Sequence, residues 1–236
     1  MQETRTVGVI GGMAWESSAT YYRMINERIA ERLGARHSAR LLLSSTDFEE
    51  IIQWHGADDW ASVGRKVTEL AQGLEKGGAG CVLIACVTQH NVADEAAAEI
   101  GIPLIHIADV TGEAIVADSR RTIGLLGTRF TMEKEFFAGR LRDRFGLDVR
   151  LPDEPGRAYL HETIFEEFAK GIFTDAARAR YVEIIRGLVA EGAEGIILGC
   201  TEIGLLIRQS DVPDVPLYDT TELHVNAAVE FSLAKD

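Results

Sequence analysis

Two cysteines end two nearly identical stretches of this chain. Residues 78–86 read GAGCVLIAC and align without gaps with residues 192–200, which read GAEGIILGC. Cys86 and Cys200 therefore occupy equivalent positions in a duplicated unit. A thiolate can remove a proton from carbon, and a thiol on the opposite face can return one. Two equivalent thiols that face one ligand thus favour a reaction that inverts a carbon centre.

Each of these cysteines is predicted to lie where a strand turns into a helix. Unpaired amides and the helix dipole lower the pKa of a thiol at a helix start, and the same amides can hold a carboxylate. Thr88 and Thr201 add hydroxyl groups beside the two cysteines. The alternative is that both cysteines are inert core residues, and their equivalent placement argues against it.

Four other residues are candidates for the neighbourhood of the thiols, each with a structural alternative. Met13 lies in the first loop and could touch a ligand, and Gln53 follows the second strand, where a solvated loop residue is the competing interpretation. Glu202 could orient Cys200 or a substrate ammonium, or serve as a first-turn acid. His90 follows Cys86 by one helical turn, and a capping or packing role is favoured there over catalysis.

Short apolar runs alternate with helical patterns along the whole chain, which is typical of parallel sheets covered by helices on both faces. We expect strands at 6–11, 39–46, 81–86, 103–107, 122–127, 147–151, 195–199 and 215–218. We expect helices near 17–33, 60–77, 89–99, 130–145, 157–170, 175–191 and 221–234. Ligands bind beyond the carboxyl ends of such strands, where both cysteines are expected.

The duplication predicts an α/β fold of two pseudo-symmetric subdomains, with the active site in the cleft between them. The strand at 6–11 matches the one at 122–127, and each begins a repeat. The first subdomain is expected to cover residues 1–104, joined by a C-terminal helix at 211–236. The second is expected to cover residues 105–210.

Composition excludes several classes of protein. The chain has 236 residues and a net charge of −13, which argues against nucleic-acid binding because no basic stripe is present. The first apolar run, residues 7–10, is too short for a signal peptide or a membrane span. Three cysteines without CxxC spacing favour a reducing, cytoplasmic setting, and Cys81 is interpreted as a core residue. The six histidines show no metal-ligand spacing.

Three motifs carry a resemblance to a known family. They are GGMAWESS at 11–18, GLLGTRFTM at 124–132 and GCTEI at 199–203. With these motifs the chain resembles the aspartate/glutamate racemases, which are cofactor-independent and use two cysteines. The resemblance covers essentially the whole chain. It implies that Cys86 and Cys200 are the catalytic acid/base pair, that the substrate is an amino acid, that no cofactor or metal is needed, and that the protein forms a homodimer.

Two departures from the family pattern affect substrate choice. Val87 stands where the family commonly has an asparagine that helps to hold the substrate. Glu166 follows Ile164-Phe165, where strict aspartate racemases have a lysine. A carboxylate there would repel an acidic side chain and favour a cationic one or a hydroxyl, although Arg40 or Arg129 could supply the missing positive charge.

Three other functions compete with amino-acid racemisation. One is isomerisation or decarboxylation of another small acid, or hydantoin-type racemisation, and Val87 favours this group. The second is a two-lobed binding protein without catalysis, against which both cysteines argue. The third is a nucleotide-binding Rossmann fold, but Gly8, Gly11 and Gly12 lack the GxGxxG spacing.

Overall fold

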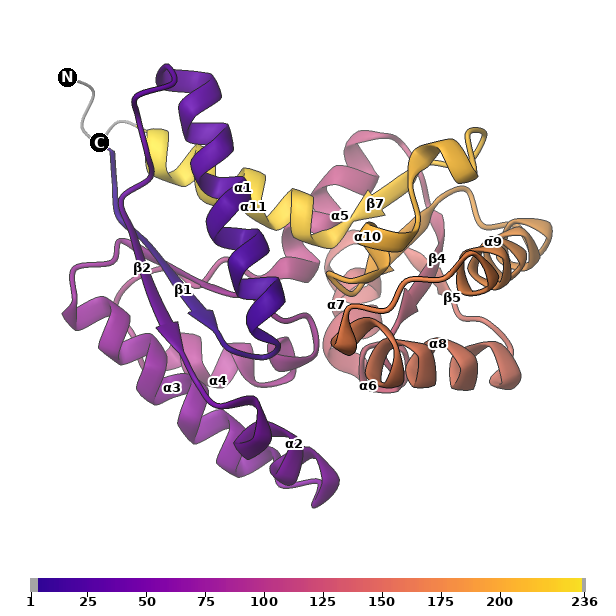
Figure 1. The fold of residues 1–236 in the computed structure, drawn as a ribbon, viewed down its shortest axis with the longest axis horizontal. Coiled ribbons are helices and arrows are strands. Elements are labelled where there is room, and N and C mark those ends of the chain that lie inside the picture. The colour runs from indigo at the N-terminus through magenta and orange to yellow at the C-terminus, as the bar shows by residue number, and fades with distance from the viewer. Residues whose placement is uncertain (1–3, 235–236) are drawn as a thin grey trace. The chain divides into compact units, whose positions relative to one another are not determined.

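The computed structural model describes residues 4–234, which form two compact α/β units (Figure 1). The first unit contains the chain up to His106 and again from His224 onward, and the second is Ile107–Leu223. The α/β class with two parallel, helix-flanked sheets is confirmed. The sequence predicts that residues 211–223 belong to the first subdomain, and this prediction is wrong. They lie in the second unit, because its last strand lies within this segment and pairs with the sheet there.

The sheet of the first unit has three parallel strands, β1 (Val7–Gly11), β2 (Leu41–Ser45) and β3 (Cys81–Ile84), in the order β2-β1-β3. Leu104 adds an isolated parallel bridge to Val82 of β3. All residues of β1 and β3 are buried, as expected for parallel strands that are covered on both faces.

Alternate residues of these strands enter two separate apolar clusters, since successive side chains of a strand point to opposite faces. Val7 and Val9 join the cluster built by α1 (Trp15–Leu33) and α11 (Thr220–Leu233). Ile10 joins the cluster on the other face. The elements of that second face are α2 (Phe48–Gly56), α3 (Trp60–Lys76), η1 (Thr88–Val92) and α4 (Ala93–Ala98).

The second unit repeats this topology with four parallel strands in the order β5-β4-β6-β7. They are β4 (Thr122–Gly127), β5 (Asp148–Arg150), β6 (Ile196–Gly199) and β7 (Leu217–Asp219). The helical elements of the unit are α5 (Ile107–Ala117), α6 (Arg129–Glu133), α7 (Glu135–Phe145), α8 (Glu154–Glu166), η2 (Phe168–Lys170), α9 (Asp175–Ala190), α10 (Ile203–Leu206) and η3 (Gln209–Asp211).

A half-buried ion-pair group joins α5 to α7 in the second unit. The guanidinium of Arg140 donates two hydrogen bonds to the Asp109 carboxylate, at 2.7 and 2.9 Å, and Arg144 donates a third at 2.6 Å. Bidentate arginine–carboxylate geometry is among the stronger side-chain pairings. This group therefore fixes the first helix of the unit against its neighbour.

The duplication seen in the sequence extends to individual hydrogen bonds. The amide of Gly80 donates to Thr6, and the amide of Glu194 donates to Thr122, both at 2.8 Å. The next bonds also match, since Val82 N donates to Pro103 O and Ile196 N donates to Pro216 O, both at 2.9 Å. The gapless alignment of 78–86 with 192–200 therefore reflects the same backbone geometry in both units.

The observed elements depart from the predicted ones at several places. The predicted strand 103–107 is wrong, because only Leu104 bridges β3 and α5 begins at Ile107. Helices α2 and α5 were not predicted. The helix expected at 89–99 is a 3₁₀ turn followed by the short α4, and the one expected at 130–145 is divided by extended backbone at Lys134. Tertiary packing and local turns decided these boundaries.

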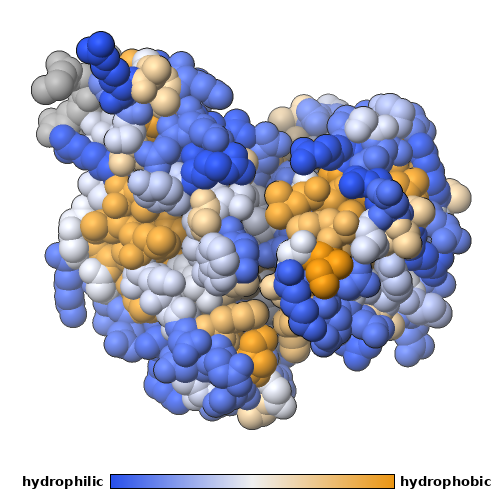
Figure 2. Space-filling model, viewed as in Figure 1, coloured by the Kyte–Doolittle hydropathy of each residue, from blue (hydrophilic) through white to orange (hydrophobic). Residues whose placement is uncertain are grey.

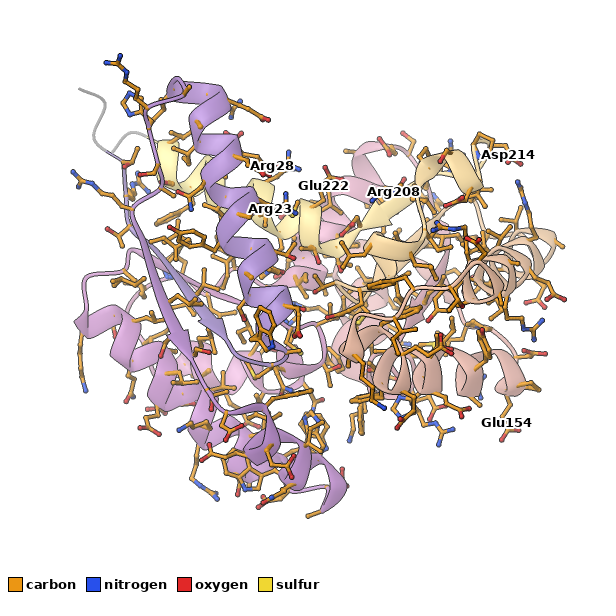
Figure 3. The ribbon with its side chains drawn as sticks, in the orientation of Figure 1. Arg23, Arg28, Glu154, Arg208, Asp214 and Glu222 are labelled. Carbon is orange, nitrogen blue, oxygen red and sulfur yellow. The ribbon has the colours of Figure 1, made fainter. Side chains whose placement is uncertain are left out.

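Surface features differ between the two units. In the first unit, β2 is an edge strand with Leu43 exposed, and Figure 2 shows apolar surface over this strand. Arg23, labelled on α1 in Figure 3, pairs with Glu27 at 2.9 Å. In the second unit Asp214, also labelled there, accepts two bonds from Arg186.

Within residues 4–234, no helix is long and apolar enough to cross a membrane.

Candidate active site

The loop after β1 lies tightly against the loop after β2 in the first unit. Gly12 has a φ of +91°, and a Cβ built there would lie 2.1 Å from the carbonyl oxygen of Thr46. Its amide donates to Ser18 Oγ at 2.8 Å. Only glycine fits this position without strain. The second glycine of the first-loop signature, Gly12, is therefore required because two loops approach closely at the carboxyl end of the sheet.

Cys86 follows β3 at the same end of this sheet and is half-buried. The last ladder bond before it runs from Ala85 N to Ile10 O at 2.8 Å. After it, the η1 turn begins at Thr88, and Cys86 packs against the apolar cluster that includes Met13. The thiol is thus carried by a short turn that is anchored to the central strand.

Three buried histidines lie together behind this turn. His90 Nδ1 lies 3.0 Å from the carbonyl oxygen of Cys86, and the ring of His90 contacts the rings of His106 and His224. His224 Nε2 lies 2.7 Å from Ile105 O, and its Nδ1 lies 2.9 Å from the hydroxyl of Tyr21. Burial, and then the neighbouring His90, lower the pKa of His224 to about 3, so His224 is neutral at pH 7.

Cys200 occupies the equivalent position after β6 in the second unit, and its thiol has a carboxylate partner. The Sγ atom donates to Glu202 Oε2 at 2.9 Å. Gly199, which precedes Cys200, must be small, because a Cβ there would lie 2.6 Å from the carbonyl oxygen of Leu126. The close approach of β4 and β6 thus sets where the Cys200 turn begins.

Tyr181 of α9 is buried near this second thiol. Burial raises the pKa of the Tyr181 hydroxyl well above its usual value, and the nearby Cys200, Glu167 and Glu202 add to the rise. Glu167 lies at the start of η2, and its Oε2 is buried without a hydrogen-bond partner among residues 4–234. The surroundings of Cys200 therefore carry two carboxylates and a protonated phenol.

The helices that follow the two cysteines are shorter than the sequence indicated. Cys86 precedes the five-residue η1, and Cys200 precedes the four-residue α10. A single turn aligns few peptide dipoles, so the helix-dipole argument for lowering the thiol pKa does not hold at either site. The Cys200 thiol has the Glu202 carboxylate as a partner, and Cys86 packs against an apolar cluster.

Within residues 4–234, no three histidine, cysteine, aspartate or glutamate side chains lie close enough together to hold a metal ion. All three cysteines are free thiols. Burial raises the pKa of Cys81 to about 12, which leaves this third thiol protonated in the core.

Comparison with known proteins assigns the family. The sequence profile of Asp/Glu/hydantoin racemases matches residues 10–228. The chain belongs to this racemase family. An Asp/Glu racemase candidate from Yersinia pestis, solved by crystallography, is 42% identical with a TM-score of 0.92, over 98% of this chain and 100% of that one.

Two further members of the racemase family show how far the likeness extends. An aspartate racemase homologue from Pyrococcus horikoshii is 32% identical with a TM-score of 0.84, over 98% of this chain and 99% of that one. A glutamate racemase from Pseudomonas entomophila is 31% identical over 66% of this chain and 59% of its own length. The match thus spans little more than half of that curated relative.

The racemase-family residues predicted from the sequence fall into two groups, one in each unit. In the first unit Met13, Val87 and Thr88 are buried near Cys86. In the second unit Thr201 is buried and Glu202 is half-buried beside Cys200. Each cysteine therefore has its own set of predicted neighbours within its unit.

Two predicted site residues have surroundings that differ from the expectation. Gln53 is not in a loop but on α2, where it is exposed and donates to Glu49 at 3.2 Å. Glu166 is exposed at the end of α8 and accepts a bond from Lys170 at 2.7 Å, which also lowers the pKa of its carboxyl group. The charge of Glu166 is thus balanced by a neighbouring lysine in this structure.

Several residues near the two thiols were missed by sequence reasoning. Glu167 and Tyr181 lie near Cys200, and His106 and His224 lie beside His90. The only feature of the sequence that could have indicated Glu167 is its position next to Glu166. The histidines are far apart in the sequence, so nothing in their spacing indicated that they would meet.

Proposed function

We propose that this protein is an amino-acid racemase in which Cys86 and Cys200 act as opposed acid/base catalysts. The observation that carries the proposal is the repeated unit of strand, cysteine and turn, once in each α/β unit, in a member of the Asp/Glu/hydantoin racemase family. Two similar solved structures, an Asp/Glu racemase candidate and an aspartate racemase homologue, support the proposal.

The chemistry follows from the needs of a Cα proton. One thiolate removes the proton, and the other thiol delivers a proton to the opposite face, so that the configuration inverts. The negative charge that develops on the α-carboxylate would be stabilised by backbone amides and by the hydroxyls of Thr88 and Thr201. This route requires both thiols to reach one Cα, and it uses neither pyridoxal phosphate nor a metal.

Glu202 gives the second thiol a defined resting state in this proposal. Because Sγ of Cys200 donates to the carboxylate, the hydrogen on sulfur is favoured and Cys200 begins as the acid. Cys86 would then begin as the base. Conversion of the opposite enantiomer would start with the two roles exchanged.

The test is deuterium incorporation at Cα, followed by proton NMR in D₂O on a panel of L and D amino acids. We expect exchange with inversion in the wild type. Cys86→Ser and Cys200→Ser should each lose inversion and slow turnover about 10²- to 10⁴-fold, the usual contribution of an acid/base group.

Cys81→Ala is the matched control, because Cys81 is a buried thiol outside the proposed chemistry. It should stay within about threefold of wild type, a change of less than 1 kcal/mol in the barrier. Inversion that survives in either serine variant would refute the two-thiol mechanism. Absence of exchange on every amino acid would favour another small acid as substrate, or a binding function.

A homodimer and a cytoplasmic location belong to the same proposal. Trp15 and Tyr22 are 68% and 55% exposed and lie two turns apart on α1, which supports an association surface on this helix. Light scattering coupled to gel filtration would give the mass of the assembly. A monomer at micromolar concentration would contradict the dimer.

A further inference from the structure

Backbone and side chain of His90 together hold the turn that carries Cys86. The amide of His90 donates to Val87 O at 3.0 Å, and its Nδ1 lies 3.0 Å from Cys86 O. A carbonyl oxygen only accepts hydrogen bonds, so Nδ1 must carry the hydrogen. The bond from Ala85 N to Ile10 O holds the chain one residue before Cys86, so the backbone is held just before Cys86 and at the carbonyl group of Cys86 itself.

The ring of His90 is itself held from two sides. The centroid of the His106 ring lies 4.8 Å from that of His90 at 69°, and the His224 ring lies 5.5 Å away at 65°. These are edge-to-face contacts between buried rings. His224 cannot turn freely, because it donates through Nε2 to Ile105 O and accepts at Nδ1 from Tyr21.

The two supporting histidines stand where the chain leaves and re-enters the first unit. His106 is the last residue before the crossing into the second unit, and His224 is the first residue after the return. Both crossing points therefore have a ring packed on the residue that holds the Cys86 turn. Burying the polar atoms of three histidine rings costs free energy unless those atoms make hydrogen bonds.

We propose that His90 is a positioning residue for Cys86, with its Nδ1 hydrogen holding the Cys86 carbonyl group and with His106 and His224 fixing the ring. The catalytic importance of this position rests on the proposed function of Cys86. The hydrogen bond and the packed rings are independent of that function, and the reactivity of the Cys86 thiol reports on them directly.

Two substitutions separate hydrogen bonding from packing. In His90→Asn, the amide nitrogen takes the place of Nδ1 and keeps the donor while losing part of the ring. In His90→Phe, the ring is kept and the donor is lost. If His90 serves only to fill space, phenylalanine should be the better replacement. If His90 positions Cys86 through its hydrogen bond, asparagine should be the better one.

The primary measurement is the alkylation rate of each cysteine by iodoacetamide in the folded full-length protein, resolved by mass spectrometry. In His90→Phe we expect Cys86 to react at least about threefold faster than in wild type, because a released turn exposes the half-buried thiol. Cys200 in the same molecule should be unchanged. In His90→Asn both rates should stay within about twofold of wild type.

The second measurement is Cα deuterium exchange on the amino acid that wild type exchanges fastest. His90→Phe should lower kcat about 10- to 100-fold with KM nearly unchanged, since a small misplacement of a catalytic group has this effect. Wild-type rates at Cys86 in His90→Phe, or equal losses in both variants, would overturn the proposal. So would faster alkylation of Cys86 and Cys200 alike, which indicates general loosening.

Two precautions keep the test decisive. If His90→Phe does not fold, as judged by circular dichroism, His90→Leu replaces it, because leucine fills part of the space of the ring and has no donor for Cys86 O. If wild type exchanges no amino acid, the proposed function fails, but the alkylation rates still decide whether His90 positions Cys86.

Discussion

The thiol of Cys200 donates to the carboxylate of Glu202, with Sγ and Oε2 2.9 Å apart. A negative charge beside sulfur disfavours the thiolate and favours the protonated form. The equivalent position in the first unit, two residues after Cys86, is occupied by Thr88. The two halves of the duplicated unit thus give their thiols different electrostatic surroundings.

Glu202→Gln should expose this difference. Removal of the charge raises the thiolate fraction of Cys200, so iodoacetamide should modify Cys200 faster at pH 7 while Cys86 is unaffected. Racemisation should slow by at least about tenfold, within the range of acid/base contributions. An unchanged Cys200 alkylation rate would show that the carboxylate does not control this thiol.

Glu166 offers a test of substrate preference. Its carboxylate is exposed and accepts a hydrogen bond from Lys170. The resemblance places a lysine of strict aspartate racemases at the position of Glu166. Glu166→Lys should raise kcat/KM for aspartate relative to a neutral amino acid by about two- to fivefold, since it reverses one exposed charge that solvent screens. Lys170→Ala is the control for lost ion pairing alone. If aspartate is already the best wild-type substrate, the electrostatic interpretation of Glu166 is wrong.

His224 should make stability depend on pH. Its pKa is about 3 in the folded protein and 6.5 when exposed, so the unfolded chain binds more protons between these values and stability falls as pH drops below about 6.5. At pH 5 this linkage costs about 2 kcal/mol relative to neutral pH.

His224→Gln separates this titration from the others, because glutamine keeps a donor for Ile105 O and does not titrate. The neighbouring His90 and His106 are present in both proteins. Thermal unfolding followed from pH 7.5 to 5 should give a shallower slope for the variant, even if its absolute stability is lower. Parallel slopes would mean that His224 is not protonated on unfolding.

Two helical glycines of the second unit predict opposite effects of alanine. A Cβ at Gly112 of α5 would lie 2.4 Å from the ring of Phe145, so Gly112→Ala should destabilise by about 1–3 kcal/mol through overpacking. Gly187 of α9 is exposed and has open space, so Gly187→Ala should stabilise by about 0.5–1 kcal/mol. Urea denaturation measures both, and a shared sign would contradict the packing described for α5.

Much of the architecture could be predicted because the repeat is explicit in the sequence. The match of 78–86 with 192–200, and of the strands that begin each repeat, indicated two parallel sheets with one cysteine after each third strand. The pattern could not settle segment 103–107, since an apolar run is equally compatible with a strand and with the start of a buried helix. Leu104 alone pairs with β3.

The sequence by itself determined the family, the duplicated α/β plan and the two equivalent thiols, since these depend on residue types at fixed local spacing. The sequence also indicated Glu202 as a neighbour of Cys200, but only the tertiary structure showed which residues from distant parts of the chain lie near each thiol. His90, His106 and His224 meet because the chain leaves the first unit after His106 and returns to it at His224. Contacts between residues more than a hundred positions apart depend on the path of the chain, and local pattern carries no record of that path.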